Sequence, residues 1–348
     1  MVRRIFNNLR NKTKQTTRSG NIYGLADFNI LKIKNINDFK NINEKSFVDI
    51  PASIPKNPFY LEKVGVTNRK HKIKIRDIFE DNKIIEVEAD IKIFFDLPEN
   101  QRGLHMSRIE KAMQEFQNTG TDLKTYAQSL IKYAAELQNR KGGEIEVEFN
   151  YEKTINKNSS GRLAHEILKI LFYGKLKEDN KFIYKLGIKA PFMNACPCPQ
   201  RWAIREFYNK LKELGFKNEE IYELASHISF GTHTNLGEAT LCIEDLNNNI
   251  NYQDLYEILD ETLSITRELL SGQDEFEFIK EALIKEQFCE DAARDLVYTV
   301  VKNLKNKIHP ESLIEIYVEV NESIHFHNLR VEIVDNFKHI LDKIEKLN

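Results

Sequence analysis

The chain has 348 residues, of which 41% are hydrophobic and 30% are charged, and its formal net charge is -2 at pH 7. This composition is typical of a folded globular protein, and the balanced charge gives no overall attraction for nucleic acid or for an anionic membrane. No run of the sequence approaches the roughly 18 apolar residues of a membrane-spanning helix. The 4 cysteines are too few to form a disulfide framework in so long a chain, so we expect a cytoplasmic protein.

Residues 1–45 form a basic extension, in which six lysines and arginines precede the first acidic residue, Asp27. A transit peptide and a poorly ordered tail can both have this composition. The segment shows no clear amphipathic pattern, and this favours the poorly ordered tail.

The first structured unit is expected to span residues 46–190. Alternation of apolar and polar side chains is typical of half-buried strands, and it predicts strands at residues 71–78, 85–93, 145–151 and 182–190. Two helices are expected between the second and the third of these strands. The capping-box sequence Ser107-Arg-Ile-Glu110 would begin the first helix, and Asp122 would begin the second.

Residues 191–348 repeat this order of elements loosely and form the expected second unit. Strands are predicted at 239–244, 313–320 and 329–334, and helices at 201–216, 254–270, 287–304 and 335–346. The two halves show no similarity residue by residue, so the duplication is inferred from the order of elements alone. Antiparallel strands with helices packed on one face predict an α+β protein.

The sequence Cys196-Pro197-Cys198 is the first candidate for chemistry. Thiolates are good ligands of zinc and iron, but two cysteines two residues apart seldom bind one ion together, and they lack the spacing of a redox loop. Prolines on both sides of Cys198 stiffen the loop. A metal ligand and an ordinary loop feature both remain open.

Three further polar residues have ordinary explanations when each is taken singly. His233 lies between Gly231 and Gly237 and precedes a predicted strand, where a histidine is more often a surface or capping residue. Glu275 is expected in a loop, and Glu290 one turn into the following helix, where acidic side chains are usually solvated.

The sequence NESIHFH at 321–327 follows a strongly alternating strand. Alternate side chains of a strand share a face, so His325 and His327 would project in the same direction, and Glu322 precedes them closely. These residues can form a metal site, an acid–base pair or the polar end of a strand. Together with the cysteines and glutamates above, they indicate a mononuclear metal site without defining its reaction.

Several of these stretches occur in the order found in one enzyme family. They are RGLHMSR at 102–108, ACPCPQ at 195–200, THTNLGEATLCIE at 232–244, QDEFEF at 273–278, EQFCEDAARDL at 286–296 and NESIHFH at 321–327. With PFYLEKVGVTNRKHKI at 58–73, they resemble the metal-dependent GTP cyclohydrolases. That family comprises the bacterial type IB enzymes of folate synthesis and the archaeal enzymes of methanopterin synthesis. The resemblance covers about residues 50–335.

The resemblance implies a tunnelling fold, in which two tandem units of antiparallel sheet carry helices on one face. It also implies a homo-oligomeric ring, expected to be a tetramer, with active sites at the subunit interfaces. GTP is the implied substrate, and neither nucleic acid nor a membrane is an expected partner.

The resemblance also implies roles for single residues. Cys196, Glu275 and His325 match the family's metal ligands, with one divalent ion per active site, Fe2+, Zn2+ or Mn2+. His233 matches the histidine that transfers protons, and Glu290 matches the glutamate that binds guanine. The residues that match supporting or proton-relay positions are Cys198, Glu322 and His327. The candidates for binding the triphosphate, by position, are Arg102, Arg108 and Arg69.

The implied reaction begins with addition of metal-activated water to C8 of the guanine. An imidazole such as that of His233 would donate a proton to the leaving ring nitrogen. A second hydrolysis would release C8 as formate, and the ribose would rearrange and close into a dihydropterin phosphate.

Two features distinguish this chain within the resemblance. The family usually continues the His233 motif with Gln-Arg, whereas this chain has Asn235-Leu236, so another residue would replace that arginine, or the substrate would be another purine or pterin. The long insertion between Cys198 and His233 resembles the archaeal branch, whose product is a cyclic phosphate rather than a triphosphate. A non-catalytic nucleotide-binding protein is the remaining alternative.

Overall fold

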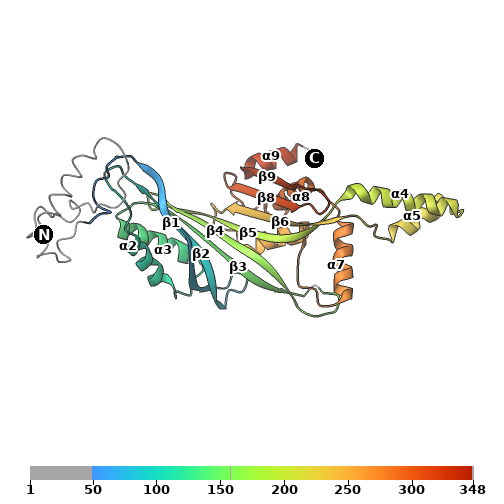
Figure 1. Ribbon diagram of the computed structural model, residues 1–348, viewed down its shortest axis with the longest axis horizontal. Helices are drawn as coiled ribbons and strands as arrows, with labels where there is room; N and C mark the ends of the chain where they lie inside the picture. The colour runs from blue at the N-terminus through green and yellow to red at the C-terminus, as the bar shows by residue number, and fades with distance from the viewer. Residues whose placement is uncertain (1–48, 157, 347–348) are drawn as a thin grey trace, which may run out of the picture. The chain divides into compact units, whose positions relative to one another are not determined.

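The computed structural model describes residues 49–346 except residue 157 (Figure 1). The predicted basic extension, residues 1–45, therefore lies outside the described residues. Contacts divide the described residues into two units, of which the smaller comprises residues 49–60 with Pro98–Gly103 and the larger comprises Leu61–Leu97 with residues 104–346.

The smaller unit is held by backbone hydrogen bonds between its two segments. The Arg102 N–H donates to the Ser53 carbonyl at 2.8 Å, and the Gly103 N–H donates to the Pro51 carbonyl at 3.1 Å. Arg102, a predicted phosphate-binding residue, thus belongs to this unit.

The larger unit contains all the strands and helices of the described residues. In chain order they are β1 (Leu61–Arg76), β2 (Ile84–Leu97), α2 (Met106–Phe116), α3 (Leu123–Gln138), β3 (Gly143–Ile155), β4 (Ala164–Leu176), β5 (Phe182–Ala195), α4 (Pro197–Glu213), α5 (Asn218–Ser226), β6 (Thr234–Glu244), α6 (Tyr252–Thr262), β7 (Ser264–Ile265), α7 (Gly272–Ile284), α8 (Cys289–Leu304), β8 (Leu313–Asn321), β9 (Asn328–Asn336) and α9 (Phe337–Glu345).

The long strands form one antiparallel sheet in the order β1-β2-β3-β4-β5-β6-β8-β9, and the short β7 pairs with β5. The core lies between one face of this sheet and the helices: α3 contacts β3 and β4, α6 contacts β5, and α8 contacts β8 and β9 (Figure 1). The predicted α+β class is confirmed. No helix within residues 49–346 is both long and apolar enough to cross a bilayer.

The order of elements is similar in the two halves of the sheet. Two strands, two helices and two strands follow one another from β1 to β4, and the same order runs from β5 to β9 when two insertions are set aside. The insertions are α4 with α5, between β5 and β6, and β7 with α7, between α6 and α8. The predicted unit boundary at residue 190 falls within β5, where the sheet is continuous.

The strand β4 is absent from the sequence-based prediction. Its residues Ile170, Leu171 and Phe172 are all buried, which breaks the alternation that reveals a strand with one wet face. Glu166 is also buried, and its carboxylate accepts a hydrogen bond from the Tyr256 hydroxyl at 2.9 Å. The burial of an acidic residue in a core cannot be predicted from the sequence unless its hydrogen-bond partner is known.

Several predicted element limits are also corrected. The capping box at Ser107 does not form: α2 begins at Met106 with His105 as its N-cap, and Glu110 instead binds the Arg69 guanidinium at 2.9 Å. The predicted helix at 254–270 ends at Thr262, and the following segment contains β7 and the unpredicted helix α7. The N-cap at Asp122 is confirmed, because its side chain accepts from the Thr125 N–H at 2.9 Å.

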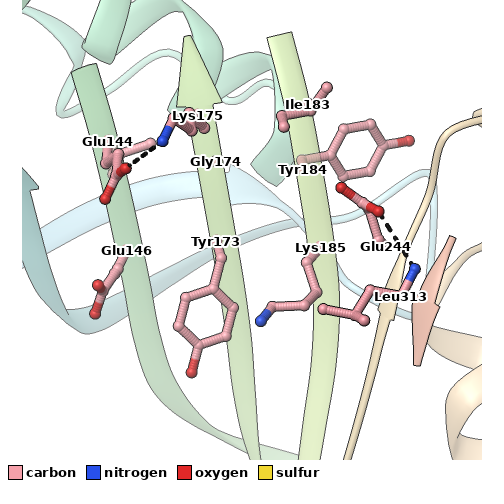
Figure 2. Close-up of a pocket in the computed structure, with 11 residues that line it drawn as sticks. Glu144, Glu146, Tyr173, Gly174, Lys175, Ile183, Tyr184, Lys185, Glu244 and Leu313 are labelled. Atoms are coloured by element: carbon pink, nitrogen blue, oxygen red, sulfur yellow. Dashed lines mark hydrogen bonds and ion pairs between the residues drawn. The ribbon is translucent and has the colours of Figure 1, made fainter. Parts of the chain in front are cut away.

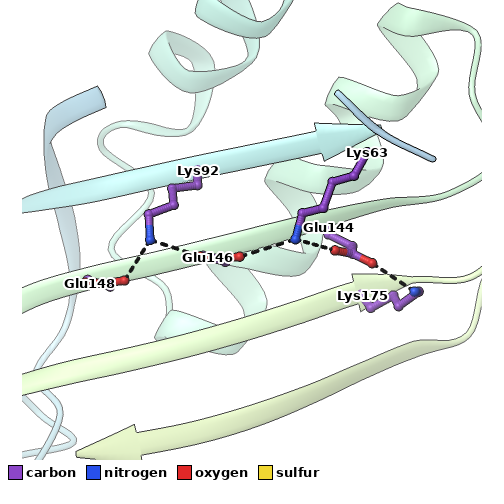
Figure 3. A network of polar contacts seen from close by, with 6 residues as sticks. All are labelled: Lys63, Lys92, Glu144, Glu146, Glu148 and Lys175. Atoms are coloured by element: carbon purple, nitrogen blue, oxygen red, sulfur yellow. Dashed lines mark hydrogen bonds and ion pairs between the residues drawn. The ribbon is translucent and has the colours of Figure 1, made fainter. Parts of the chain in front are cut away.

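The other face of the sheet carries charged side chains joined into ion pairs (Figure 3). Lys92 contacts Glu146 and Glu148 at 3.0 Å each, and Glu144 contacts both Lys63 and Lys175. Because lysines and glutamates alternate across neighbouring strands, this face has no large excess of either charge.

Two hollows lie on this charged face. One, of about 180 Å³, lies across β3, β4 and β5 (Figure 2), and the other measures about 460 Å³. They share Tyr173 and Lys185, and neither is lined by a predicted site residue.

Candidate active site at one end of the sheet

Two chain connections, the one from β5 to β6 and the one from β8 to β9, meet at one end of the sheet because of the strand register. Ala195, the last residue of β5, pairs with Thr234, the first residue of β6. β6 also pairs with β8, whose last residue, Asn321, pairs with Asn328 at the start of β9. Both ends of the connection from β5 to β6 and both ends of the connection from β8 to β9 therefore lie at the same end of the sheet, and these two connections carry most of the predicted site residues.

The cysteine loop is fixed to the segment that carries His233. The backbone N–H of Cys196 donates to the His233 carbonyl at 3.2 Å, and the Thr232 hydroxyl donates to the Cys196 carbonyl at 2.6 Å. Cys196 is the N-cap of α4, with Pro197 at the first helical position, which suits the fixed φ of proline. The loop is thus held on both sides of the thiol.

The two thiols of this loop lie close to each other. Burial raises the pKa of Cys196, the backbone N–H of Cys198 lowers it, and the charges of Cys198 and Glu322 raise it. The net shift is upward, so the protonated thiol is favoured until a cation binds, because metal binding requires the thiolate.

The three predicted site histidines form a ring cluster. The rings of His325 and His327 stack with centroids 5.3 Å apart, and the His233 ring meets the His325 ring edge-on at 6.5 Å. The prediction that His325 and His327 project in the same direction is therefore confirmed by their contact. They lie in the connection between β8 and β9 rather than within a strand.

Glu322 lies in the connection between β8 and β9, directly after the last residue of β8. One of its carboxylate oxygens, Oε2, is buried without a hydrogen-bond partner among the described residues. Its charge contributes to the raised pKa of Cys196 and to the raised pKa of Cys289, for which burial is the largest cause. A buried carboxylate oxygen without a hydrogen-bond partner is suited to accept a proton or to face a cation.

The connection between α7 and α8 is fixed to the same end of the sheet. The Asn194 side-chain amide donates to the Gln287 carbonyl at 2.7 Å, and the Gln287 N–H donates to the Ala195 carbonyl at 3.1 Å. Glu290, the predicted guanine-binding residue, follows as the second residue of α8, with an exposed side chain. Its position at the helix start places it near this connection.

Gln200 holds three segments together. Its buried Nε2 donates to the Leu283 carbonyl at 3.0 Å, near the end of α7, and to the Phe230 carbonyl at 3.3 Å, in the approach to His233. The sequence analysis did not identify Gln200, Asn194 or Asn235 as functional. These residues share one feature that could have revealed them, namely a buried amide side chain within or beside a recognised motif. Their burial cannot be inferred from such short stretches of sequence.

Glu275 lies in the first turn of α7 with an exposed side chain, not in the predicted loop. Its neighbour Asp274 is 2% exposed and accepts hydrogen bonds from the backbone N–H and the hydroxyl of Ser160, both at 2.9 Å. Glu275 precedes Leu283 by eight residues, about 12 Å along a helix axis. The start of α7 is therefore anchored to the connection between β3 and β4, away from the contact with Gln200.

The donor types at the sheet end fit a divalent transition metal. Thiolate, imidazole and carboxylate ligands suit zinc and ferrous iron, and the lone buried oxygen of Glu322 has free acceptor capacity. Within residues 49–346, however, no three His, Cys, Asp or Glu side chains of this single chain lie close enough to hold an ion together. Cys196, Glu275 and His325 are not brought together as one set of ligands, and their assignment stays a prediction.

The predicted phosphate-binding arginines of the larger unit have protein partners. The Arg108 guanidinium donates to the Leu137 carbonyl at 2.8 Å, and the Arg69 guanidinium makes two hydrogen bonds to the Glu110 carboxylate. These contacts use only part of the donors of each guanidinium, so they do not prevent phosphate binding. Phosphate binding by Arg108 and Arg69 therefore also stays a prediction.

Comparison with known proteins gives one consistent result. The family described as type I GTP cyclohydrolase folE2 matches residues 47–330. GTP cyclohydrolase MptA of Methanococcus aeolicus is 30% identical over 311 residues, covering 82% of this chain and 96% of that protein. The MptA proteins of Methanothermobacter thermautotrophicus and of Methanococcus maripaludis strain C6 are 29% and 28% identical and cover 87% and 86% of this chain.

Among solved structures, a hyper-thermostable uricase mutant aligns with a TM-score of 0.39 and 7% sequence identity, covering 81% of this chain and 93% of that chain. A likeness this weak supports no argument. The family match spans the strands and connections that build the sheet end described above. This chain belongs to the type I GTP cyclohydrolase folE2 family.

Proposed function

We propose that this chain opens the imidazole ring of GTP at C8, releases formate and forms a 7,8-dihydroneopterin phosphate. The observation that carries the proposal is the meeting of the cysteine loop, His233 and the histidine-bearing connection at one end of the sheet. These segments come from distant parts of the sequence and lie within the region that matches the family.

We propose a role for each predicted site residue. His233 would donate a proton to the ring nitrogen that leaves C8. Glu290 would accept hydrogen bonds from the guanine ring N–H and the exocyclic amine, for which its exposed carboxylate is available. The residues proposed to relay protons or support these groups are Cys198, Glu322 and His327.

One divalent metal ion, Fe2+, Zn2+ or Mn2+, would be held by Cys196, Glu275 and His325 in the assembled oligomer, because these side chains do not form one set of ligands within the described residues of the single chain. When bound, such an ion lowers the pKa of a coordinated water from about 15.7 to about 7 and so makes a nucleophile available at neutral pH. The raised pKa of Cys196 makes the occupancy depend on pH, because the thiol must lose its proton to bind the ion.

The product proposed for this chain is the 2',3'-cyclic phosphate rather than the triphosphate. The support is the insertion formed by α4 and α5, which resembles the archaeal branch, and the similarity to the MptA proteins. A cyclic phosphate retains one of the three phosphorus atoms of GTP, so the other two leave as diphosphate. Diphosphate release therefore separates the two products.

We further propose the tandem tunnelling fold and a homo-oligomeric ring with sites at subunit interfaces. The repeated order of elements in the two halves supports the tandem fold. Within the described part of the chain, the outermost strands β1 and β9 each have one unpaired edge, and an adjacent copy could pair with them. We propose that the reaction takes place in the cytoplasm.

The decisive experiment is incubation of the purified protein with GTP and Fe2+, Mn2+ or Zn2+ under anaerobic conditions. Formate, pterin fluorescence after oxidation, diphosphate and the product mass are measured. We expect formate and the cyclic phosphate in equal amounts. Triphosphate product without diphosphate would contradict the proposed branch, and absence of both formate and pterin with every metal would contradict the function.

A second candidate function is hydrolysis of another purine or pterin. It is favoured by Leu236, which replaces the arginine usual in the family and has a 58% exposed side chain. A screen of nucleotides and pterins in the same assay separates the two, since efficient turnover of GTP alone would exclude this candidate.

A further inference from the structure

Asn235 is a buried residue that connects two parts of the candidate active site. Its side chain lies at the start of β6 and is 4% exposed. Its Oδ1 accepts the backbone N–H of Ser323 at 2.9 Å, which fixes the connection between β8 and β9 to β6. The same oxygen lies 3.4 Å from Nδ1 of His233.

These contacts determine the orientation of the amide. A backbone N–H can only donate, so the Asn235 atom that faces Ser323 must be the oxygen and not the nitrogen. That oxygen can only accept, so the hydrogen bond to the imidazole requires a hydrogen on Nδ1 of His233. The Ser323 hydroxyl, also 3.4 Å from Nδ1, can accept from the same hydrogen.

We propose that Asn235 is a positioning residue that holds His233 in the tautomer with its hydrogen on Nδ1. In that tautomer Nε2 is the nitrogen that accepts a proton, and in the protonated ring Nε2 can deliver it. The inference rests on the proposed role of His233 in the cyclohydrolase reaction. It gives Asn235, which stands where the family usually has glutamine, a defined task in this chain.

The direct test is long-range 1H–15N NMR of the full-length protein labelled at histidine, at a pH where the rings are neutral. The His233 signals are identified by comparison with His233→Gln. We expect the wild-type ring to show the Nδ1–H pattern and Asn235→Ala to show a mixture of tautomers. An Nε2–H pattern in the wild type would overturn the inference, whatever the activity of the protein.

The matched control is Asn194→Ala. Asn194 lies directly opposite Asn235 on β5 and is equally buried, but its amide binds the Gln287 carbonyl. We expect its His233 signals to keep the wild-type pattern. If Asn194→Ala shifts the tautomer as much as Asn235→Ala does, the effect is a general loosening of the sheet end and the inference fails.

The kinetic test uses formate release from GTP. Asn235→Ala is expected to lower kcat by about 10-fold with little change in KM, because GTP binding does not need the Nδ1 contact. Asn235→Asp keeps an oxygen acceptor at the same place and is expected to recover most of kcat. Equal kcat in the wild type and Asn235→Ala, with both folded, would contradict the inference. If the wild type itself releases no formate from GTP, only the proposed function is contradicted, because the NMR measurement of the His233 tautomer does not depend on activity.

Discussion

Glu322 and the two histidines that follow it have different surroundings although they share one short connection. The carboxylate of Glu322 is partly buried and its charge acts on the Cys196 thiol, whereas His325 and His327 are exposed and stack on each other. Only the family resemblance separates His325, as a predicted metal ligand, from Glu322 and His327, as predicted proton-relay or supporting residues. The structure supplies a physical difference, because the Glu322 charge acts on the Cys196 thiol, whereas the His325 ring contacts the rings of His233 and His327.

The division of roles between the stacked histidines can be tested by metal analysis. We expect His325→Asn to lose the bound metal and His327→Asn to retain it, because only His325 is proposed as a ligand. Metal content after loading with Zn2+ and removal of excess ion is measured for both variants. Equal loss in both would contradict the assignment.

Asp77 gives a prediction about stability and pH. Burial would raise its pKa, but hydrogen bonds from the Phe79 N–H, the Tyr151 hydroxyl and the Glu80 N–H, together with the charge of Lys83, lower it overall. A lowered pKa in the folded state stabilises the fold above the unfolded pKa of about 4, and this contribution is lost as the pH falls below that value.

We therefore expect Asp77→Asn to reduce the free energy of unfolding at pH 7 by about 1–3 kcal/mol, because a charged acceptor is lost from a buried position. Its stability should also fall less steeply than that of the wild type below about pH 4. Urea unfolding at pH 7 and pH 3.5 measures both effects. Asp81→Asn, in the same turn but exposed, is the control and should match the wild type.

Single residues also show what sequence could and could not provide for the site. Cys196, His233, Glu290 and His325 were predicted because their motifs resemble a family; the family is confirmed, and the roles of these residues stay predictions. The amide side chains of Asn194, Gln200 and Asn235 were not identified. An amide has no distinctive chemistry in a sequence, and its role follows only from the partners that the fold gives it.

At the scale of elements, the connections at the sheet end depend on Gln200. Gln200→Leu leaves the Phe230 and Leu283 carbonyls without this donor, so we expect a loss of about 1–3 kcal/mol in stability and a lower kcat/KM for GTP. Thermal unfolding and formate release measure the two effects. Gln253→Leu, which removes only an exposed hydrogen bond in α6, is the control. Unchanged values in Gln200→Leu would show that the three segments are held by other contacts.

Gly237 in β6 marks a close approach inside the sheet. A Cβ at this position would lie 2.5 Å from the ring of Phe192, which is fully buried. We expect Gly237→Ala to lower the free energy of unfolding by about 1–3 kcal/mol, because the ring has little room to move. Gly272→Ala, at the start of α7 with no atom near its Cβ position, should not destabilise the protein. Denaturant unfolding of both variants provides the measurement.

The accuracy of the predicted elements follows from their burial. β2, β3, β8 and β9 were predicted because apolar and polar residues alternate along them, and the structure confirms these strands. β4 was missed because several of its consecutive residues are buried, so it lacks the alternation of apolar and polar residues that identifies a half-exposed strand. α7 was missed because its exposed Phe276 and Ile279 interrupt the expected amphipathic pattern.

At the scale of the whole molecule, the proposed ring predicts a native mass. We expect analytical ultracentrifugation to give about four times the 40.8 kDa mass of the chain, and activity to depend on that assembly. Dilution should lower the specific activity at concentrations where the assembly dissociates. A monomer that retains full activity would contradict the proposal of sites at subunit interfaces.

The hairpin of α4 and α5 leaves the sheet at Cys196 and returns at His233, and hydrogen bonds between the two ends close its base (Figure 1). The turn between the helices contains Gly215, which has a positive φ of 90° and no atom near its Cβ position. A chemical group attached at this turn is therefore separated by many residues from Cys196 and from His233, the two ends of the hairpin. A fluorescent label attached next to Gly215 would leave the sheet unmodified. Because the α4–α5 hairpin begins and ends at the candidate active site, the label would report optically on movements of this hairpin.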